Sequence, residues 1–347
     1  MTTFDHAILA CPITKENLRM VDLNQTQLAF FEKYKPHFQG FINDSNTVVY
    51  PVVQGVIVLL PNYAMLANGE EKPMPFDKDR VFRYYNQIEY EQLDDSIVYS
   101  DAKKFVDFRP VNKTYLENAL KRVSKYIAPT GKYCLDIASG PIGLKEYLEL
   151  SAGYEWRICI DISINALIQA KKNLGEEKGI FICGDITNIP LQAEVCAAVI
   201  SQHTLYHVPK NEQETAVREL YRVAKEGACI AIVYNWFYHS LLMNIALLPL
   251  QVYRVIRHLL GKFYVKLWPS KPRLYFYPHS YFWFKNLGYG DKLNIYVWRT
   301  LNVQFMRLYI HDWLGGQKML QFFQHLEDRF PKTMGFLGDY PLIVIKK

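Results

Sequence analysis

Apolar residues recur along this chain in two alternating patterns. Short continuous apolar runs, typical of strands buried on both faces, are separated by stretches in which apolar residues return at helical spacing. The runs are 133–137, 156–160, 179–183, 197–201, 229–234, 292–297 and 342–345, and the helical stretches are 144–150, 164–174 and 212–223. Strands that alternate with helices predict an α/β fold with a doubly wound, mostly parallel sheet.

The flanking parts of the chain predict additional units. Residues 1–65 contain two apolar strands around a Gln-Gly turn and predict a small α+β N-terminal domain. Residues 66–112 are polar and weakly periodic, as in a linker with helical pieces. The alternating region then forms one domain over 113–347. A helical, aromatic-rich insertion or lid is expected at about 236–290, and 304–330 is expected to be helical with an interruption at two glycines.

Composition and charge narrow the class of protein. Half of the 347 residues are hydrophobic and 21% are charged, so the chain can bury a large core. The net charge is +6 without a dense run of Lys or Arg, so no nucleic-acid partner is expected. Six cysteines without a C-x-x-C pair argue against a thiolate metal site and indicate a reducing cytoplasm. Residues 1–20 lack the apolar core of a signal peptide, so the predicted location is cytoplasmic.

Acidic residues follow the ends of three successive predicted strands. Asp136 precedes a turn that contains Gly140, Asp161 ends the second strand, and Asp185 follows the third. The carboxyl ends of neighbouring parallel strands line one crevice, so these side chains are expected to converge. Gly140 allows close approach of a ligand to the backbone, and a carboxylate at the second strand end can accept hydrogen bonds from both ribose hydroxyls of an adenosine ligand.

The segments CLDIASGPIG, ICIDIS, ICGDITNIPL and ISQHTLYHV resemble, in order and spacing, the motifs of the class I S-adenosylmethionine-dependent methyltransferases. The resemblance covers about 113–236 and implies a Rossmann-like, seven-stranded sheet with one reversed strand. It implies that the turn at Gly140 holds the methionine end of the cofactor, Asp161 the ribose and Asp185 the adenine, and that the residues after the fourth strand face the sulfonium. The residues implied in cofactor binding are Asp136, Ala138, Ser139, Gly140, Gly143, Asp161, Ile162, Gly184, Asp185, Ile186, Ser201 and Gln202.

The turn departs from the usual pattern of this family. Ala138 stands in place of the first glycine and Ile142 in place of the third, with Gly143 one position later. The same turn is one substitution from the G-x-G-x-x-G of nicotinamide-dependent enzymes. A pyrophosphate site needs that first glycine and has no particular need of Asp136 or Asp185, so methyl transfer is favoured over hydride transfer.

The N-terminal segments LACPITKENL and YPVVQGVIVLLP resemble the small zinc-ribbon-like family that includes an activator subunit of tRNA and protein methyltransferases. Metal-binding members of that family carry further cysteines. Here Thr14 occupies the second position of the first cysteine pair, and no second pair exists, so no metal is expected. A structural or docking module is the better interpretation of this region.

Three histidines are candidates for catalysis. His203 and His207 follow the fourth predicted strand, and His279 lies in an aromatic cluster that could roof an acceptor pocket. A histidine is the natural general base for a hydroxyl acceptor near neutral pH. The alternative for His207 is a purely structural hydrogen bond to the loop backbone.

The stretch after Trp236 is apolar, with no charged residue between Trp236 and Tyr253. It could form a cap over the active site, or lie in a membrane interface through 236–271, aided by nearby basic residues such as Arg254 and Arg257. Its polar residues make a true membrane span the weaker interpretation.

The sequence therefore predicts an S-adenosylmethionine-dependent methyltransferase, with O-methylation of a small or apolar acceptor such as a lipid, polyketide, glycolipid or sugar. Two alternatives stay open: a catalytically silent scaffold with this fold, and a tRNA or protein methyltransferase.

Overall fold

The computed structural model describes residues 4–22, 39–93, 96–100, 106–261 and 274–347. The strands are β1 (Leu18–Asp22), β2 (Gln39–Asn43), β3 (Val48–Val53), β4 (Val56–Val58), β5 (Met65–Leu66), β6 (Tyr90–Leu93), β7 (Ser96–Tyr99), β8 (Gly131–Ile137), β9 (Tyr154–Asp161), β10 (Gly179–Cys183), β11 (Cys196–Gln202), β12 (Ala224–Val233), β13 (Leu293–Arg299) and β14 (Tyr340–Lys346). The helices are α1 (Phe76–Gln87), α2 (Lys113–Lys121), α3 (Lys145–Glu149), α4 (Ile164–Leu174), α5 (Gln213–Val223), α6 (Leu241–Ala246), α7 (Leu248–Gly261), α8 (Tyr281–Lys285), α9 (Val303–Tyr309), α10 (Gly316–Arg329) and α11 (Pro331–Leu337).

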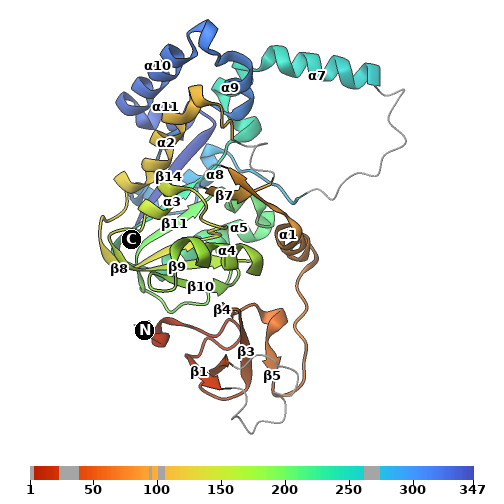
Figure 1. The fold of residues 1–347 in the computed structure, drawn as a ribbon, viewed down its shortest axis with the longest axis vertical. Coiled ribbons are helices and arrows are strands. Elements are labelled where there is room, and N and C mark those ends of the chain that lie inside the picture. The colour runs from red at the N-terminus through yellow and green to blue at the C-terminus, as the bar shows by residue number, and fades with distance from the viewer. Residues whose placement is uncertain (1–3, 23–38, 94–95, 101–105, 262–273) are drawn as a thin grey trace.

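Five parallel strands form the centre of the sheet, in the order β10, β9, β8, β11, β12. Next to them β14 pairs antiparallel with both β12 and β13. Helices pack on both faces, because successive strand residues point to opposite sides. Val199 on β11 packs in a cluster with α5, and its neighbour Ile200 packs in another with α2. The predicted α/β sheet with helices is confirmed (Figure 1).

The sheet is larger than the seven strands that the sequence predicted. β4 pairs parallel with β10, with Ile57 opposite Ile182 and Val58 opposite Cys183. β3, β2 and β1 continue the sheet by antiparallel pairing, and β5 pairs with β3. In the described part of the chain the sheet therefore has twelve strands. The continuation is tightly packed, because Val56 and Val58 are fully buried in one cluster with residues of α4 and β10.

Two segments add detail to the elements that the sequence predicted. The stretch 66–112, predicted as a linker with helical pieces, contains the helix α1 and also an antiparallel hairpin formed by β6 and β7, which was not predicted. The helical region predicted at 304–330 is divided into α9 and α10 near the two glycines, by a short turn at Asp312–Leu314 followed by Gly315 with φ +71°.

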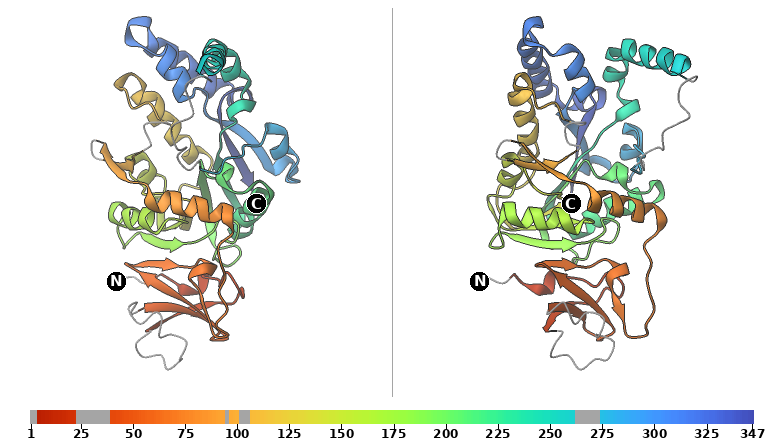
Figure 2. Two further views of the ribbon diagram at one scale, coloured as in Figure 1. Left: turned by 90° about the vertical axis from the view of Figure 1, so that its right-hand side faces the viewer. Right: turned by 45° about the vertical axis from the view of Figure 1, so that its right-hand side comes forward.

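The predicted insertion at about 236–290 contains α6, α7 and α8 in its described residues, whereas 262–273 lies outside them. Of these helices, α7 extends away from the rest of the molecule (Figures 1 and 2). Among the helices that the structure describes, none is long and apolar enough to cross a membrane.

Candidate functional site

The turn after β8 lies against the end of β9, where it meets Asp161. Gly140 has φ +58° and donates its backbone N–H to Oδ2 of Asp161 at 2.9 Å. The N–H of Ser163 donates to Oδ1 of the same carboxylate at 2.8 Å. Ala138 also has a positive φ, at +55°, a conformation that glycine adopts without strain. The structure thus brings together the two residues that the sequence placed at the methionine and ribose ends of the crevice.

Asp161 is a buried carboxylate at a strand tip. Burial raises its pKa to about 6, while the N–H groups of Ser163 and Gly140 act in the opposite direction by favouring the charged form. Each carboxylate oxygen has two acceptor positions, so hydroxyl donors can still bind beside these N–H groups. The geometry therefore suits a site that binds neighbouring hydroxyl groups at this tip.

Asp136 lies in the interior rather than at the surface of the crevice. Its Oδ2 accepts a hydrogen bond from Nε of Arg157 on β9 at 3.2 Å, and both side chains are almost completely buried. The same guanidinium donates to Oγ of Ser151 at 3.3 Å. This ion pair joins β8 to β9 just below the turn, so Asp136 has a structural partner within the protein.

The carboxylate of Asp185 is bound by a lysine from α1. Nζ of Lys78 lies 2.6 Å from Oδ2 of Asp185 and 2.5 Å from Oε2 of Glu212. It also donates to Oγ1 of Thr187 at 2.7 Å. The three ionic side chains are mostly buried. Desolvation acts to lower the pKa of Lys78, but the charges and hydrogen bonds of Asp185 and Glu212 together outweigh it and raise this pKa. Lys78 therefore fixes α1 beside the end of β10.

A cavity of about 210 Å³ lies next to Asp185 and is mainly apolar. Its walls include residues that the resemblance implied in cofactor binding, such as Asp185, and residues from the segments before and after β5. Its lining is Leu60, Pro61, Asn62, Lys72, Pro73, Met74, Pro75, Lys78, Ile162, Asp185, Thr187 and Asn188. Apolar walls with a few convergent polar groups are the usual surroundings of a small ligand.

The other predicted residues at these strand ends take the following positions. Ser139 and Gly143 belong to the turn before α3, and Gly184 donates its N–H to the carbonyl of Asp161 at 3.0 Å. Ile186 is buried in the core cluster on one face of the sheet.

A strap formed by α1 and the β6–β7 hairpin covers the strand tips. The sequence predicted helical pieces in this stretch but not the hairpin. Oγ of Ser163 donates to the carbonyl of Tyr85 at 3.0 Å, and Nδ2 of Asn165 donates to the carbonyl of Asn86 at 2.9 Å. The ring of Tyr99 lies over Gly140, since a Cβ added at that glycine would be 3.4 Å from the ring and from its hydroxyl. The density of tyrosines in 84–99 was the signal that could have indicated this cover.

Polar groups at the end of β11 are buried without partners. Within the described residues, Oγ of Ser201 and Oε1 of Gln202 have no hydrogen bond. The next residue, His203, has φ +57°, a strained conformation for a side chain of this size. Its ring packs edge-on against Trp298 and Tyr340, at centroid distances of 4.9 and 5.6 Å. Burial and the nearby charge of Arg299 lower its pKa to about 3, so His203 is neutral at physiological pH.

The other two histidines are fixed by neighbouring groups. Nδ1 of His207 lies 2.8 Å from the carbonyl of Tyr275, a backbone group outside its own loop. The ring of His279 stacks on Trp283 with centroids 4.0 Å apart, and burial lowers its pKa to about 4.

A further acidic residue at the carboxyl edge of the sheet, besides Asp161 and Asp185, was not found from the sequence. Asp339 precedes β14 and is 3% exposed, and its Oδ1 has no hydrogen-bond partner in the described part of the chain. Burial raises its pKa to about 7, opposed by hydrogen bonds with Asn302 and Asn235 and by the charge of Arg299. The Arg299 guanidinium stacks on the ring of Tyr340 at 4.4 Å. The position of Asp339 directly before the last apolar run was the signal available in the sequence.

His203 and Asp339 belong to one buried polar cluster together with Asn235 and Arg299, because all four stand at the same edge of neighbouring strands. His203 follows β11, Asn235 follows β12, Arg299 ends β13 and Asp339 precedes the reversed strand β14. Nε of Arg299 also lacks a hydrogen-bond partner among the described residues. Buried donors and acceptors normally have partners, so the unpaired atoms make this edge a candidate site for a polar ligand group.

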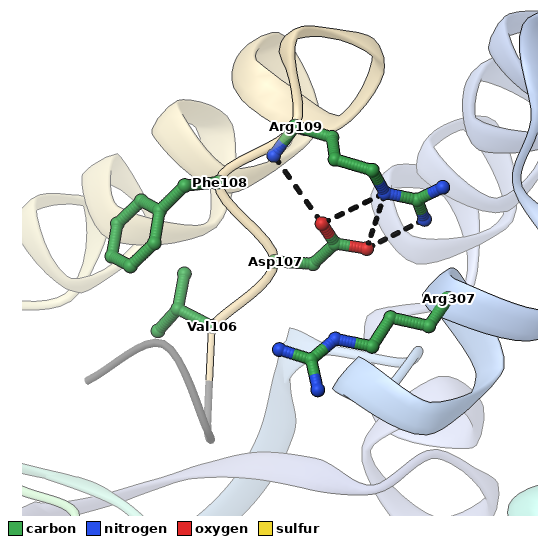
Figure 3. Close-up of a pocket in the computed structure, with 5 residues that line it drawn as sticks. All are labelled: Val106, Asp107, Phe108, Arg109 and Arg307. Atoms are coloured by element: carbon green, nitrogen blue, oxygen red, sulfur yellow. Dashed lines mark hydrogen bonds and ion pairs between the residues drawn. The ribbon is translucent and has the colours of Figure 1, made fainter. Parts of the chain in front are cut away.

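A separate cavity of about 550 Å³ is lined by Val106, Asp107, Phe108, Arg109 and Arg307 (Figure 3). Asp107 and Arg109 form a two-pronged ion pair, with Nε–Oδ1 and Nη2–Oδ2 distances of 2.9 and 2.6 Å. None of the lining residues belongs to the predicted cofactor set. The strand tips, rather than this cavity, therefore carry the predicted chemistry.

Potential metal ligands do not gather in the described residues: no three His, Cys, Asp or Glu side chains come together there. In the N-terminal unit, Cys11 is buried with its Sγ 3.6 Å from the hydroxyl of Tyr50. Thr14 accepts a hydrogen bond from Nδ2 of Asn43 at 3.3 Å.

Comparison with known proteins shows that the central segment is similar to a known family of domains. Residues 135–232 match the family model Methyltransf_11, described as a methyltransferase domain. The match covers β8 to β12 with the tips that carry Asp161 and Asp185. It confirms the predicted methyltransferase class for this segment and supports S-adenosylmethionine as the cofactor. No curated protein matches the chain.

Solved structures with a similar arrangement include methyltransferases of two archaea. One is a complex of the Haloferax volcanii Trm112 methyltransferase activator with a methyltransferase, at 12% identity and TM-score 0.43, covering 68% of this chain and 91% of that one. Another is a SAM-dependent methyltransferase from Archaeoglobus fulgidus, at 16% identity and TM-score 0.41, covering 68% and 94%. At these values the similarities carry no argument about the activity of this chain.

Proposed function

We propose that this chain is an S-adenosylmethionine-dependent methyltransferase that methylates a hydroxyl group of a small or apolar acceptor. The observation that carries the proposal is the joint between Gly140 and Asp161, where a positive-φ turn and a buried carboxylate meet at adjacent strand tips. Such a joint places a close backbone approach beside an acceptor of ribose hydroxyls.

The residues at the strand tips fit the cofactor that the methyltransferase match supports. In this proposal Gly140, with Ala138, Ser139 and Gly143, holds the methionine end, and Asp161 with Ile162 holds the ribose. Adenine occupies the cavity beside Asp185, Gly184 and Ile186, next to Lys78. The unpaired groups of Ser201 and Gln202 then face the sulfonium end, where the methionine tail supplies further hydrogen-bonding groups. Asp136 acts indirectly in this arrangement, through its ion pair with Arg157.

The bound cofactor supplies an already activated methyl group, so the protein mainly has to position the acceptor. A hydroxyl acceptor must also lose its proton, and a base whose pKa is near the working pH is best matched to that task. Asp339, with a pKa raised to about 7, meets this condition better than His203, whose pKa is lowered to about 3. We therefore assign proton acceptance to Asp339. His203 contributes shape and a neutral hydrogen-bonding ring, and His207 and His279 shape the aromatic side of the site.

The acceptor is inferred to be apolar from the aromatic surroundings of this edge. Tyr206, Phe237 and Phe276 pack together with centroid distances between 4.2 and 5.6 Å, and Tyr206 also contacts the ring of His207. Of the acceptors considered from the sequence, a lipid, polyketide or glycolipid with one hydroxyl near the polar cluster fits this environment, and a free sugar fits it less well. Peripheral contact with a membrane through the insertion would bring such acceptors to the site.

Calorimetry with S-adenosylhomocysteine tests the cofactor site directly. We expect the unmodified protein to bind it, and Asp161→Ala to bind it at least about tenfold more weakly, because the ribose loses two charge-assisted hydrogen bonds. Asp291→Ala, at an exposed aspartate, is the matched control and should leave the affinity unchanged. No binding by the unmodified protein at millimolar ligand would refute the proposal and favour the alternative of a silent scaffold.

Two alternatives to this proposal involve the N-terminal unit. A catalytically silent scaffold would use this unit as its docking surface. A role in tRNA or protein methylation is suggested only by the resemblance of this unit to the zinc-ribbon-like activator family. The buried carboxylate at a glycine turn favours the enzyme over the scaffold. Ionising such a group costs free energy, and a silent copy has no need of it.

A further inference from the structure

The helix α7 presents its apolar side chains to solvent. Leu248, Val252, Val255 and Ile256 are each at least half exposed. At 100° per residue these four positions share one side of the helix. In α6, which precedes it, Leu241 and Ile245 are also more than half exposed. The two helices together therefore carry a continuous set of exposed aliphatic side chains.

The opposite side of α7 contacts the protein. Leu250 packs on the cluster that includes Met306 and Phe305 of α9. Nη1 of Arg254 donates to Oε1 of Gln304 on α9 at 3.2 Å. A surface helix of a globular protein normally turns its apolar stripe toward the core and its charged residues to solvent. In α7 the aliphatic side chains face solvent instead, and Arg254 and Arg257 are exposed as well, so within the described part of the chain this apolar stripe is left uncovered.

The charge of the surrounding sequence identifies the kind of partner. From 235 to 290 the sequence contains seven Lys or Arg residues and no Asp or Glu, whereas the whole chain has a net charge of +6. The excess positive charge is thus confined to this insertion. A second copy of the chain would bring two such segments together and would be repelled, while an anionic surface is attracted. A nucleic acid would supply the charge but would not accept the exposed aliphatic side chains.

We propose that α6 and α7 lie in the interface of an anionic lipid bilayer, with Leu241, Ile245, Leu248, Val252 and Val255 inserted among the acyl chains. A helix with aliphatic residues on one side and arginines on its flank and opposite side suits such a position in the plane of the membrane. The described helices do not cross a membrane, so the protein lies on the surface. The lipid contact stands without the proposed methyl transfer. A further step, in which an acceptor reaches the strand tips from the bilayer, depends on the proposed methyl transfer.

Flotation with vesicles tests the contact, using phosphatidylcholine alone and an equal mixture with phosphatidylglycerol. We expect the protein to float with the anionic vesicles at low salt and to be released by salt, which screens the charge attraction. Val252→Asp/Val255→Asp should reduce partitioning at least about tenfold, because two inserted side chains become charged. Met20→Asp is the control, since Met20 is an exposed apolar residue on β1, outside the insertion, and this variant should float normally.

Two results would overturn the proposal. One is absence of flotation by the unmodified protein at low salt, and the other is equal flotation of the double variant. A concentration-dependent dimer that the double variant loses, without vesicle binding, would assign the apolar stripe to a second copy instead. S-adenosylhomocysteine binding by the same proteins is measured separately, so failure at the membrane and failure of the cofactor site are distinguishable.

Discussion

The buried carboxyl group of Asp339 should make the stability of the protein depend on pH. Its pKa is raised from 3.8 to about 7, because the side chain is buried, and this burial outweighs the hydrogen bonds with Asn302 and Asn235 and the charge of Arg299. A shift of about 3 units corresponds to about 4 kcal/mol between the protonated and ionised forms. In the native state the proton stays bound up to about pH 7, whereas in the unfolded chain it is lost near pH 4. The contribution is therefore fully present below about pH 4 and is lost as the pH rises to about 7.

Urea denaturation of the unmodified protein and of Asp339→Asn between pH 5 and pH 8 measures this effect. The asparagine does not titrate, so the difference in unfolding free energy between the two proteins should change by about 3 kcal/mol across this range, with the unmodified protein relatively less stable at the higher pH. Asp291→Asn is the control, because it removes an exposed carboxyl group and leaves the buried one in place. If the Asp339→Asn curve runs parallel to that of the unmodified protein, Asp339 does not hold a proton near neutral pH and its assignment as proton acceptor fails.

Three further substitutions test the strand tips. Arg157→Met leaves Asp136 buried without its charged partner, so we expect a loss of about 3–5 kcal/mol in unfolding free energy by urea denaturation; a loss below about 1 kcal/mol would contradict this. Gly140→Val places a β-branched residue at φ +58°, so S-adenosylhomocysteine binding should weaken about tenfold or more by calorimetry, and an unchanged affinity would argue against the turn as its site. Lys78→Met releases α1 from Asp185, so amides of α1 should exchange faster with solvent; unaltered exchange rates would show that the ion pair does not hold α1.

The sequence predicted the centre of the sheet because the signals for it are local. A buried strand is a short apolar run, and the residue that ends it is adjacent to it in sequence, so Asp161 and Asp185 could be placed at strand tips without knowledge of the fold. The positive φ of Gly140 belongs to the local turn after β8, whereas its contact with Asp161 also depends on the pairing of β8 with β9. The pairing of Asp136 with Arg157 was not predictable in this way, because it depends on the register between β8 and β9.

Other features were missed because they depend on contacts between segments that are distant in the sequence. Asp339 becomes part of the polar cluster only because β14 inserts between β12 and β13, an order that the apolar runs do not reveal. Similarly, the strap residue Tyr99 lies over Gly140 although about forty residues separate them. The protonation states of His203 and Asp339 depend on burial, which lowers the pKa of His203 and raises the pKa of Asp339.

The parallel pairing of β4 with β10 gives the N-terminal unit a direct part in the proposed cofactor site. Without β4, β10 would be an exposed edge strand of the sheet, and open edges invite pairing with other chains. The segment that follows β4 continues along the end of β10, where the N–H of Leu59 donates to the carbonyl of Cys183 at 2.8 Å. Leu60 and Pro61 come next and form a wall of the cavity beside Asp185. The strand β4, which covers the edge of β10, thus also leads into the segment that lines the pocket proposed for adenine. The N-terminal unit therefore contributes residues to the proposed cofactor site.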